Sequence, residues 1–156
     1  MKLRSIDIEV RLLAAALLCL GLQACGEPPT PPEQAIREWV AEGQRLAEDK
    51  DRKALMDMIS ESYTDARGNK QEDIENMFRL YFLRQNNIQL LTKINDIRIF
   101  GDTAAELDLT VGMAGTNDGT LGFSADAYNF ELELILDGDD WILTTGRWGE
   151  VGGDMR

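Results

Sequence analysis

Few residues in this chain have side chains suited to catalysis, and the residue types that are missing exclude several catalytic mechanisms. The 156 residues include no histidine, which removes the usual group for proton transfer near neutral pH and every Ser-His or Cys-His nucleophile pair. Tyr63 and Asp65 lie close together in the segment 61–69, which Gly and Asn mark as a loop. A desolvated carboxylate there gains a raised pKa and can act as a base. Asp65 could equally begin a turn, so both interpretations stay open.

A second group of candidates lies on a predicted β-hairpin. Residues 127–136 alternate apolar and polar side chains, residues 137–140 contain an Asp-Gly turn, and residues 141–148 return as a second strand. A turn centred on residues 138–139 sets the register of the two strands. It predicts four cross-strand pairs on the dry face: Leu136 with Trp141, Leu134 with Leu143, Leu132 with Thr145, and Phe130 with Arg147.

The predicted position of Arg147 on the dry face suggests a ligand. A buried cation needs a carboxylate partner or a bound anion, so Arg147 and its neighbour Phe130 are ligand-binding candidates. Two alternatives remain open. Arg147 could form a salt bridge with Asp65, or a bulge at Gly146 could turn it to water and exchange it with Trp148.

The opposite face of the hairpin carries both acidic and apolar side chains. Glu131 and Glu133 share this wet face, where solvation explains them better than acid–base chemistry. Ile135, Ile142 and Trp148 form an apolar stripe on it, and such stripes often mark protein contacts. We therefore expect a homodimer through the outer face of the sheet.

The composition excludes several classes of function. The chain has 28 Asp and Glu residues against 16 Lys and Arg, a net charge of −12, whereas nucleic-acid binding needs clustered basic residues. The acidic loops at 117–119 and 137–140 lack the carboxylate spacing of a calcium site, and the sequence has no phosphate loop. We expect no metal, no cofactor and no nucleic-acid partner.

The N-terminus has the features of a secretory signal. Lys2, Arg4 and Arg11 precede an apolar run, residues 12–22, which is far shorter than the ~20 residues of a spanning helix. The following Leu-Gln-Ala-Cys resembles the lipobox of bacterial lipoproteins, in which a signal peptidase cuts before a Cys that carries diacylglycerol. The resemblance implies a signal peptide at 1–24, with Cys25 as the lipidated residue.

The predicted lipid anchor sets the expected location. Residues 25–32 continue from Cys25 into a Pro-rich tether. Gly26 stands where many inner-membrane lipoproteins have Asp, so the resemblance implies a bacterial cell-envelope protein, held by lipid at the outer membrane and facing the periplasm.

Periodicity then predicts the elements of the domain. Three-and-four spacing of apolar residues indicates a helix opened by Pro31 and Pro32 with Thr30 as a cap, a short helix at 52–60, and a helix at 71–85. Residues 87–100 and 105–113 are expected strands, and 114–122 a Gly-rich loop. Helices followed by an antiparallel meander of about four strands define an α+β domain at 33–149 with a tail at 150–156.

The order of these segments also carries a resemblance. The helix with Trp39, the segment ESYTDARG and the helix spanning 74–82 are followed by IFGDTAAELDLTV and YNFELELILDGDDWILTTGRW. This arrangement resembles the nuclear transport factor 2-like (SnoaL-like, cystatin-like α+β) superfamily. The resemblance implies N-terminal helices packed in the concavity of a strongly bent, cone-like sheet, often with a pocket at its open end. It places Tyr63 and Asp65 near that pocket, where enzymatic members use a Tyr or an Asp.

Two functions are consistent with these observations. The lack of His and of a strong catalytic motif favours a membrane-anchored, non-catalytic binding or assembly module that takes a small anionic or apolar ligand. Tyr63 then joins Arg147 and Phe130 as a ligand-binding candidate. The alternative is a small-molecule enzyme of proton-transfer type, an isomerase, cyclase or dehydratase, with Asp65 and Tyr63 as acid–base groups.

Overall fold

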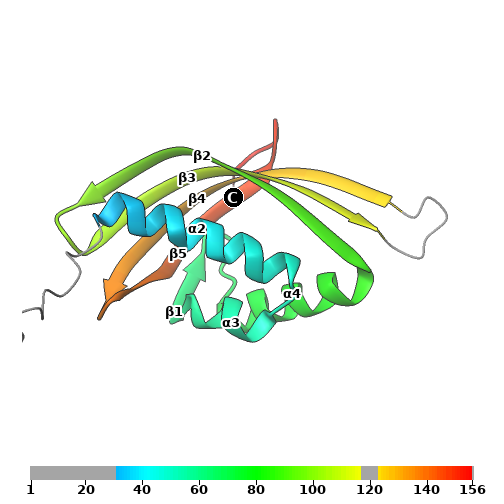
Figure 1. Cartoon of the computed structure of the whole chain (residues 1–156), viewed down its shortest axis with the longest axis horizontal. Coiled ribbons are helices and arrows are strands. Elements are labelled where there is room, and N and C mark those ends of the chain that lie inside the picture. The colour runs from blue at the N-terminus through cyan, green and yellow to red at the C-terminus, as the bar shows by residue number, and fades with distance from the viewer. Residues whose placement is uncertain (1–30, 117–122, 156) are drawn as a thin grey trace, which may run out of the picture. The chain divides into compact units, whose positions relative to one another are not determined.

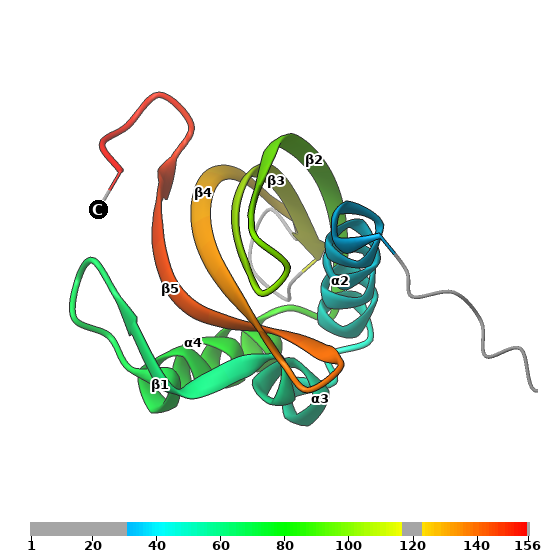
Figure 2. The same cartoon turned by 90° about the vertical axis from the view of Figure 1, so that its left-hand side faces the viewer.

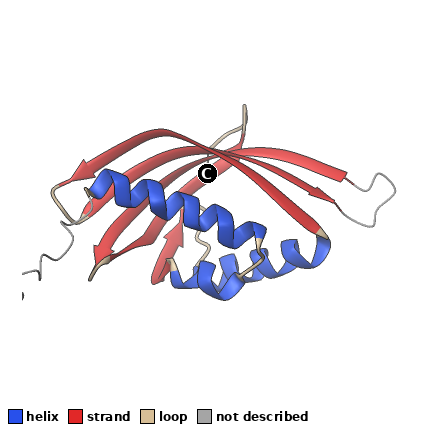
Figure 3. Cartoon of the chain, in the orientation of Figure 1, coloured by secondary structure: helices blue, strands red, loops and turns tan. Residues whose placement is uncertain are grey.

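The computed structural model describes residues 31–116 and 123–155, so the predicted signal peptide, Cys25, Thr30 and residues 117–122 lie outside the described part of the chain. Helices precede a long meander of strands (Figures 1 and 3). In chain order the elements are α2 (Pro32–Glu48), α3 (Arg52–Asp57), β1 (Ile59–Asp65), α4 (Gln71–Arg84), β2 (Asn87–Phe100), β3 (Ala104–Thr116), β4 (Phe123–Asp137) and β5 (Asp140–Glu150). No helix among the described residues is long and apolar enough to cross a membrane.

The five strands form one strongly curved sheet in the order β1-β5-β4-β3-β2. Strands β2 to β5 are an antiparallel meander, and β1 adds to β5 in parallel. Figure 2 shows the sheet curling around α2, with α3 and α4 below it. The predicted α+β class and bent sheet are confirmed, but the sheet has five strands instead of about four.

Strand β1 is the element that the sequence pattern missed. The predicted helix at 52–60 ends at Asp57, and the predicted loop 61–69 begins as a strand. The amide of Leu143 donates to the carbonyl of Met58 (3.0 Å), which starts the pairing with β5. Ile59, Tyr63 and Asp65 are buried, while the residues at 60–62 lie at a register shift and face solvent in part. This irregular edge strand has no clean two-residue alternation in its sequence.

The core lies between α2 and the concave face of the sheet. Ile36 on α2 and Leu107 on β3 are both fully buried, and Val40, Leu134 and Trp141 pack around them. Ile59, Tyr63 and Leu143 form a second cluster near β1, and Trp39 packs against both clusters. Polar side chains of α2 also bond to the free edge of β2: Gln44 Nε2 donates to the Leu90 carbonyl (3.1 Å), and the Leu90 amide donates to Glu48 (2.7 Å).

The β4–β5 hairpin forms at the predicted turn, but its register changes after two of the four predicted pairs. Gly138 adopts a positive φ of 65°, which glycine tolerates without strain. Leu136 pairs with Trp141 and Leu134 with Leu143, as predicted. An irregularity follows, because Glu133 pairs with Thr145 and leaves Thr144 as an extra residue in β5. Beyond this bulge, every side chain of β5 lies on the face opposite to the predicted one.

Candidate functional site

Asp65 ends β1 and holds the loop that follows it. Its carboxylate accepts hydrogen bonds from the amide of Arg67 (2.9 Å) and from the amide and side-chain nitrogen of Asn69 (2.8 and 2.7 Å). The side chain of Trp148 on β5 lies near enough to lower the pKa of this carboxylate further. The residue is only 5% exposed, so the three hydrogen-bond donors replace the water that a carboxylate otherwise needs.

The environment of Asp65 is that of a stable carboxylate, not of a base. Burial is the largest single influence and acts to raise the pKa of Asp65, but the hydrogen bonds from Asn69 and Arg67, together with the contact of Trp148, outweigh it and lower the pKa. The raised pKa expected for a catalytic base is therefore wrong for this residue. The turn interpretation fits the observed geometry, because the loop amides fold back onto the side chain.

Arg67 fixes the same loop to β5 from the other side. Its guanidinium lies 3.7 Å from the centroid of the Trp148 ring, and its Nη2 donates to the Trp148 carbonyl (3.1 Å). Asp65, Arg67 and Trp148 therefore form a polar clamp that joins the β1–α4 loop to the end of β5. No pattern in the sequence marks Arg67, since its partner lies 81 residues away.

Tyr63 points from β1 into the domain interior. The side chain is 4% exposed and belongs to the cluster with Ile59 and Leu143, against which Ile74 and Phe78 of α4 pack. Burial, together with the negative charge of Asp65, raises the pKa of Tyr63 to about 12. The phenol is therefore protonated at neutral pH and available as a hydrogen-bond donor.

Aromatic side chains form two sets, one on α4 and the other on β4 and β5, and the rings within each set contact one another. On α4, the rings of Phe78 and Phe82 stack with centroids 5.7 Å apart. On β4 and β5, Tyr128, Phe130 and Trp148 contact one another at centroid distances of 6.0–6.5 Å. None of these five rings is fully buried, and α4 has no buried residue at all. Phe78 and Phe130 pack against the core clusters on one side, and all five rings remain partly exposed.

The pKa of Tyr81 on α4 is influenced by groups of β4. After burial, Asp126 and Tyr128 of β4 are the influences that raise the pKa of Tyr81 on α4, which places these groups within electrostatic range. Deeper inside, the indole nitrogen of Trp39 is buried without a hydrogen-bond partner among the described residues. An unpaired donor beside apolar surface is costly, and it would be satisfied by an acceptor on a bound molecule.

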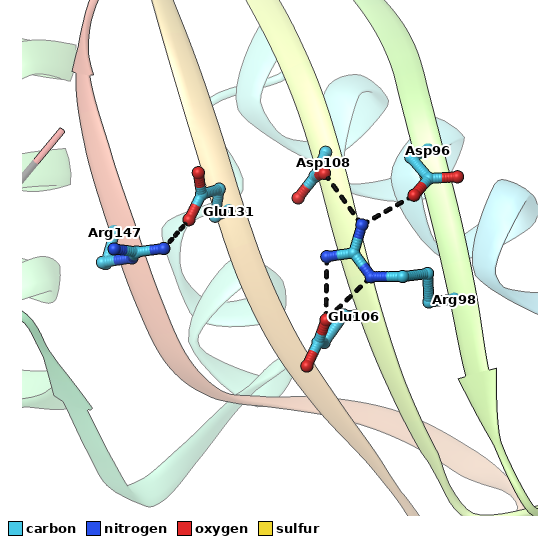
Figure 4. Close-up of polar contacts among 6 residues, drawn as sticks. All are labelled: Asp96, Arg98, Glu106, Asp108, Glu131 and Arg147. Carbon is cyan, nitrogen blue, oxygen red and sulfur yellow. Dashed lines mark hydrogen bonds and ion pairs between the residues drawn. The ribbon is translucent and has the colours of Figure 1, made fainter.

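Arg147 does not lie inside the cone. The bulge at Thr144 turns it to the outer face, where it pairs across the strands with Glu131 and forms an ion pair with that carboxylate (Figure 4). Trp148 takes the predicted inner position opposite Phe130. The prediction that Arg147 faces the core is wrong, and the alternative in which a bulge exchanges it with Trp148 is correct in kind, with the bulge two residues earlier than Gly146.

The predicted interface stripe is changed by the same bulge. Ile135 and Ile142 remain cross-strand neighbours on the outer face, and Ile135 is 43% exposed. Trp148 leaves the stripe for the inner face. The register adds Phe100 of β2, which is 51% exposed and joins the row through Ala104.

A cleft of about 330 Å³ hollows the outer face beside this row, lined mainly by polar side chains of all five strands. Its central group is Arg98 of β2, whose guanidinium contacts three carboxylates (Figure 4): Asp96 (2.6 Å), Glu106 (2.8 Å) and Asp108 (3.2 Å). Arg98 was not predicted as a site residue, because the three acids come together only through strand pairing. Over residues 31–116 and 123–155, no group of three or more His, Cys, Asp or Glu is arranged to hold a metal ion.

Solved structures share this architecture. A candidate scytalone dehydratase from Novosphingobium aromaticivorans superposes with a TM-score of 0.69 at 9% identity, covering 76% of this chain and 83% of that chain. A candidate dehydratase of the NTF2-like family from Streptomyces avermitilis gives 0.66 at 9% identity, over 81% and 100% of the two chains. A ketosteroid isomerase-like protein from Erwinia carotovora atroseptica gives 0.61 at 10% identity, over 76% and 95%.

These likenesses define the fold. The described domain has the nuclear transport factor 2-like fold, as the order of segments predicted. No family model matches the sequence, and no curated protein matches it.

Proposed function

We propose that the domain binds a small molecule with an apolar or aromatic body at the open end of the cone and polarises an oxygen of that molecule through a hydrogen-bond donor, as an enzyme of the dehydratase or isomerase type would. The observation that carries this proposal is the pair of partly open aromatic surfaces on α4 and on β4–β5. Partly exposed apolar walls with a few polar groups are typical of ligand sites. The dehydratase and isomerase names of the structural neighbours support the same class of reaction.

Tyr63 is the group best suited to act on such a molecule. Its phenol is protonated at neutral pH, as an unperturbed tyrosine would be, and burial and the charge of Asp65 raise its pKa further, to about 12. A neutral phenol can donate a hydrogen bond to a carbonyl or hydroxyl oxygen and stabilise negative charge that develops there. The unpaired indole nitrogen of Trp39 would supply a second donor. Asp65 would position Tyr63 and sustain its protonation, without receiving a proton itself.

A non-catalytic binding module is the second candidate, and the state of Asp65 favours it. Asp65 is the only fully buried carboxylate among the described residues, and its lowered pKa makes it a weak base. If no other group accepts a proton from the ligand, the same aromatic end would bind a small molecule without converting it.

For the location we propose the cell envelope. Cys25 would carry the lipid and residues 25–32 would hold the domain away from the outer membrane on its periplasmic side. Radiolabelled palmitate should enter the full-length chain in its host and fail to enter Cys25→Ser. Incorporation into that variant would contradict the anchor.

The binding proposal is tested by native mass spectrometry of the full-length chain purified in mild detergent from its own host. We expect a co-purifying small molecule that is retained in the outer-face variant Phe100→Leu and reduced in Trp39→Phe. Protein that is empty when purified from several growth conditions would contradict the site.

The catalytic part needs a separate measurement. Incubation of the released molecule with fresh protein should change its mass or its isomeric form, and Tyr63→Phe should slow this conversion by about 100-fold, the usual effect of losing one acid–base or oxyanion group. A molecule that binds and is returned unchanged would establish the non-catalytic module instead.

A further inference from the structure

The outer face of the sheet, opposite the cone, is ordered into rows of distinct chemistry. Strand pairing places four apolar side chains side by side across four strands: Phe100, Ala104, Ile135 and Ile142. We call this set the apolar row. A charged row lies two residues further along β2, β3 and β4, and three residues further along β5 because of the bulge at Thr144; a second charged row lies two residues beyond the first. These rows contain Arg98, Glu106, Glu133 and Thr145, and then Asp96, Asp108, Glu131 and Arg147.

The charged rows contain like charges placed directly opposite each other. Glu106 pairs with Glu133, and Asp108 pairs with Glu131, on adjacent strands. Side chains in such pairs are only ~5 Å apart at Cβ, and like charges there are destabilising. Arg98 and Arg147 compensate from the flanking strands. The cations that stabilise the charged rows therefore come from the flanking strands β2 and β5, and not from β3 and β4, which carry the paired acids.

The compensation is incomplete. Four carboxylates of these rows line the cleft beside two guanidinium groups, which leaves two negative charges in excess; the fifth lining carboxylate, Asp65, is buried and held by the donors of its own loop. Arg98 is shared among three acids and Arg147 is paired with Glu131. Glu133 at the centre forms no ion pair with any described residue. A cationic group entering the cleft would be attracted by the excess charge and would relieve the repulsion between the paired acids.

We propose that this face is a docking site for an extended segment of a partner protein that carries a Lys or Arg two to four residues from an apolar residue. The apolar side chain of the partner would pack on the apolar row, in which Phe100 and Ile135 are exposed. The charged rows begin two and four residues away, or about 7 and 14 Å by the rise of a strand. The basic side chain should therefore follow or precede the apolar one by two to four residues.

Charge argues for this occupant over a second copy of the chain. The chain carries a net charge of −12, so a face-to-face homodimer would bring two acidic clefts or acidic turns together. The proposal is independent of the cone, because the two surfaces lie on opposite faces of the sheet.

The test uses the full-length chain and short fluorescent peptides, with binding measured by anisotropy at low and high salt. The probe peptide carries Leu followed by Lys at the second and fourth positions after it. One control replaces both Lys by Glu, and another keeps the composition but separates Leu from Lys by a Gly-Ser spacer. The protein variants are Glu133→Gln and Ile135→Ser, with Glu72→Gln on the exposed side of α4 as the matched control.

We expect the probe to bind more tightly than both control peptides, and more weakly at high salt. Glu133→Gln should weaken binding about two- to fivefold and Ile135→Ser about fivefold, whereas Glu72→Gln should have no effect. Equal affinity for the Lys and Glu peptides would overturn the proposal, as would binding that neither outer-face variant changes. A stable dimer that Ile135→Ser converts to a monomer, in protein that binds no peptide, would overturn it in favour of a second copy.

Discussion

The side chain of Trp148 on β5 lies near enough to the carboxylate of Asp65 on β1 to help lower its pKa, and this contact joins the β1–α4 loop to the end of β5. It exists only because the bulge at Thr144 turns Trp148 inward and because β1 brings Asp65 alongside β5. With Arg67 stacked on the same indole, the contact closes the loop between β1 and α4. The loop is therefore held in place beside Trp148, one of the aromatic side chains of β5.

Replacing Asp65 by Asn should destabilise the domain by about 2 kcal/mol, the usual cost of losing hydrogen bonds to a buried charged group. Asn retains an oxygen for the amides of Arg67 and Asn69, but its amide nitrogen would meet the side-chain nitrogen of Asn69. Urea unfolding at neutral pH measures the loss. Asp57→Asn, at an exposed position, is the control and should change little.

The same carboxylate predicts how stability depends on pH. Because folding lowers the pKa of Asp65, the deprotonated form is favoured in the folded state. Its stabilisation is fully present above the unfolded pKa of about 4 and is lost as pH falls through the lower folded pKa. Unfolding curves from pH 7 downwards should show this loss in the native chain and a smaller slope in Asp65→Asn. Identical slopes would show that Asp65 is not held as an ion.

Tyr63 makes the opposite prediction at alkaline pH. Folding raises the pKa of its phenol from 10.0 to about 12, so the protonated form is favoured in the folded state. Its stabilisation is complete below about pH 10 and is lost as pH rises towards 12. Ultraviolet titration of phenolate should show a step near pH 12 that is missing in Tyr63→Phe. If that variant instead loses a step near pH 10, the phenol is not buried as described.

The local part of the hairpin was predictable, and its far end was not. An Asp-Gly turn and alternating apolar residues determine the pairing of Leu136 with Trp141 and of Leu134 with Leu143, since these pairs lie next to the turn. Threonine occurs on both the buried and the exposed faces of strands, so the residue types at positions 144 and 145 do not predict a bulge there. One extra residue there exchanged Arg147 with Trp148.

The inner site depended on contacts between distant segments. Strand β1 pairs in parallel with β5, about 80 residues later, and its polar residues at 60–62 resemble a loop. The sequence was sufficient to select Asp65 as a candidate site residue. The direction of its pKa shift was not predictable, because it depends on contacts with Asn69 and Trp148. The helical pattern at 71–85 was reliable because apolar residues at three-and-four spacing mark a helix face locally.

Gly146 and Tyr63 should behave as a coupled pair. A Cβ at position 146 would lie 3.2 Å from the Tyr63 hydroxyl and 3.2 Å from a methyl group of Leu132. Gly146→Ala should therefore cost about 1–3 kcal/mol of stability through overpacking. In a Tyr63→Phe background the hydroxyl is absent, and the same substitution should cost less, by about 1 kcal/mol. Urea unfolding of the four proteins in the cycle measures this coupling, and additive costs would contradict the contact.

Arg98 should stabilise the sheet in a way that depends on salt. Its guanidinium contacts Asp96, Glu106 and Asp108, and without it the like-charged pairs between β3 and β4 lose compensation from β2. Arg98→Ala should lower the thermal midpoint most at low ionic strength, with the difference narrowing in high salt as the repulsion is screened. Arg37→Ala removes a single ion pair to Glu33 on α2 and is the matched control, with a smaller effect expected. If Arg98→Ala lowers the midpoint equally at all salt concentrations, then Arg98 acts through the packing of its aliphatic stem and the acid pairs need no cation.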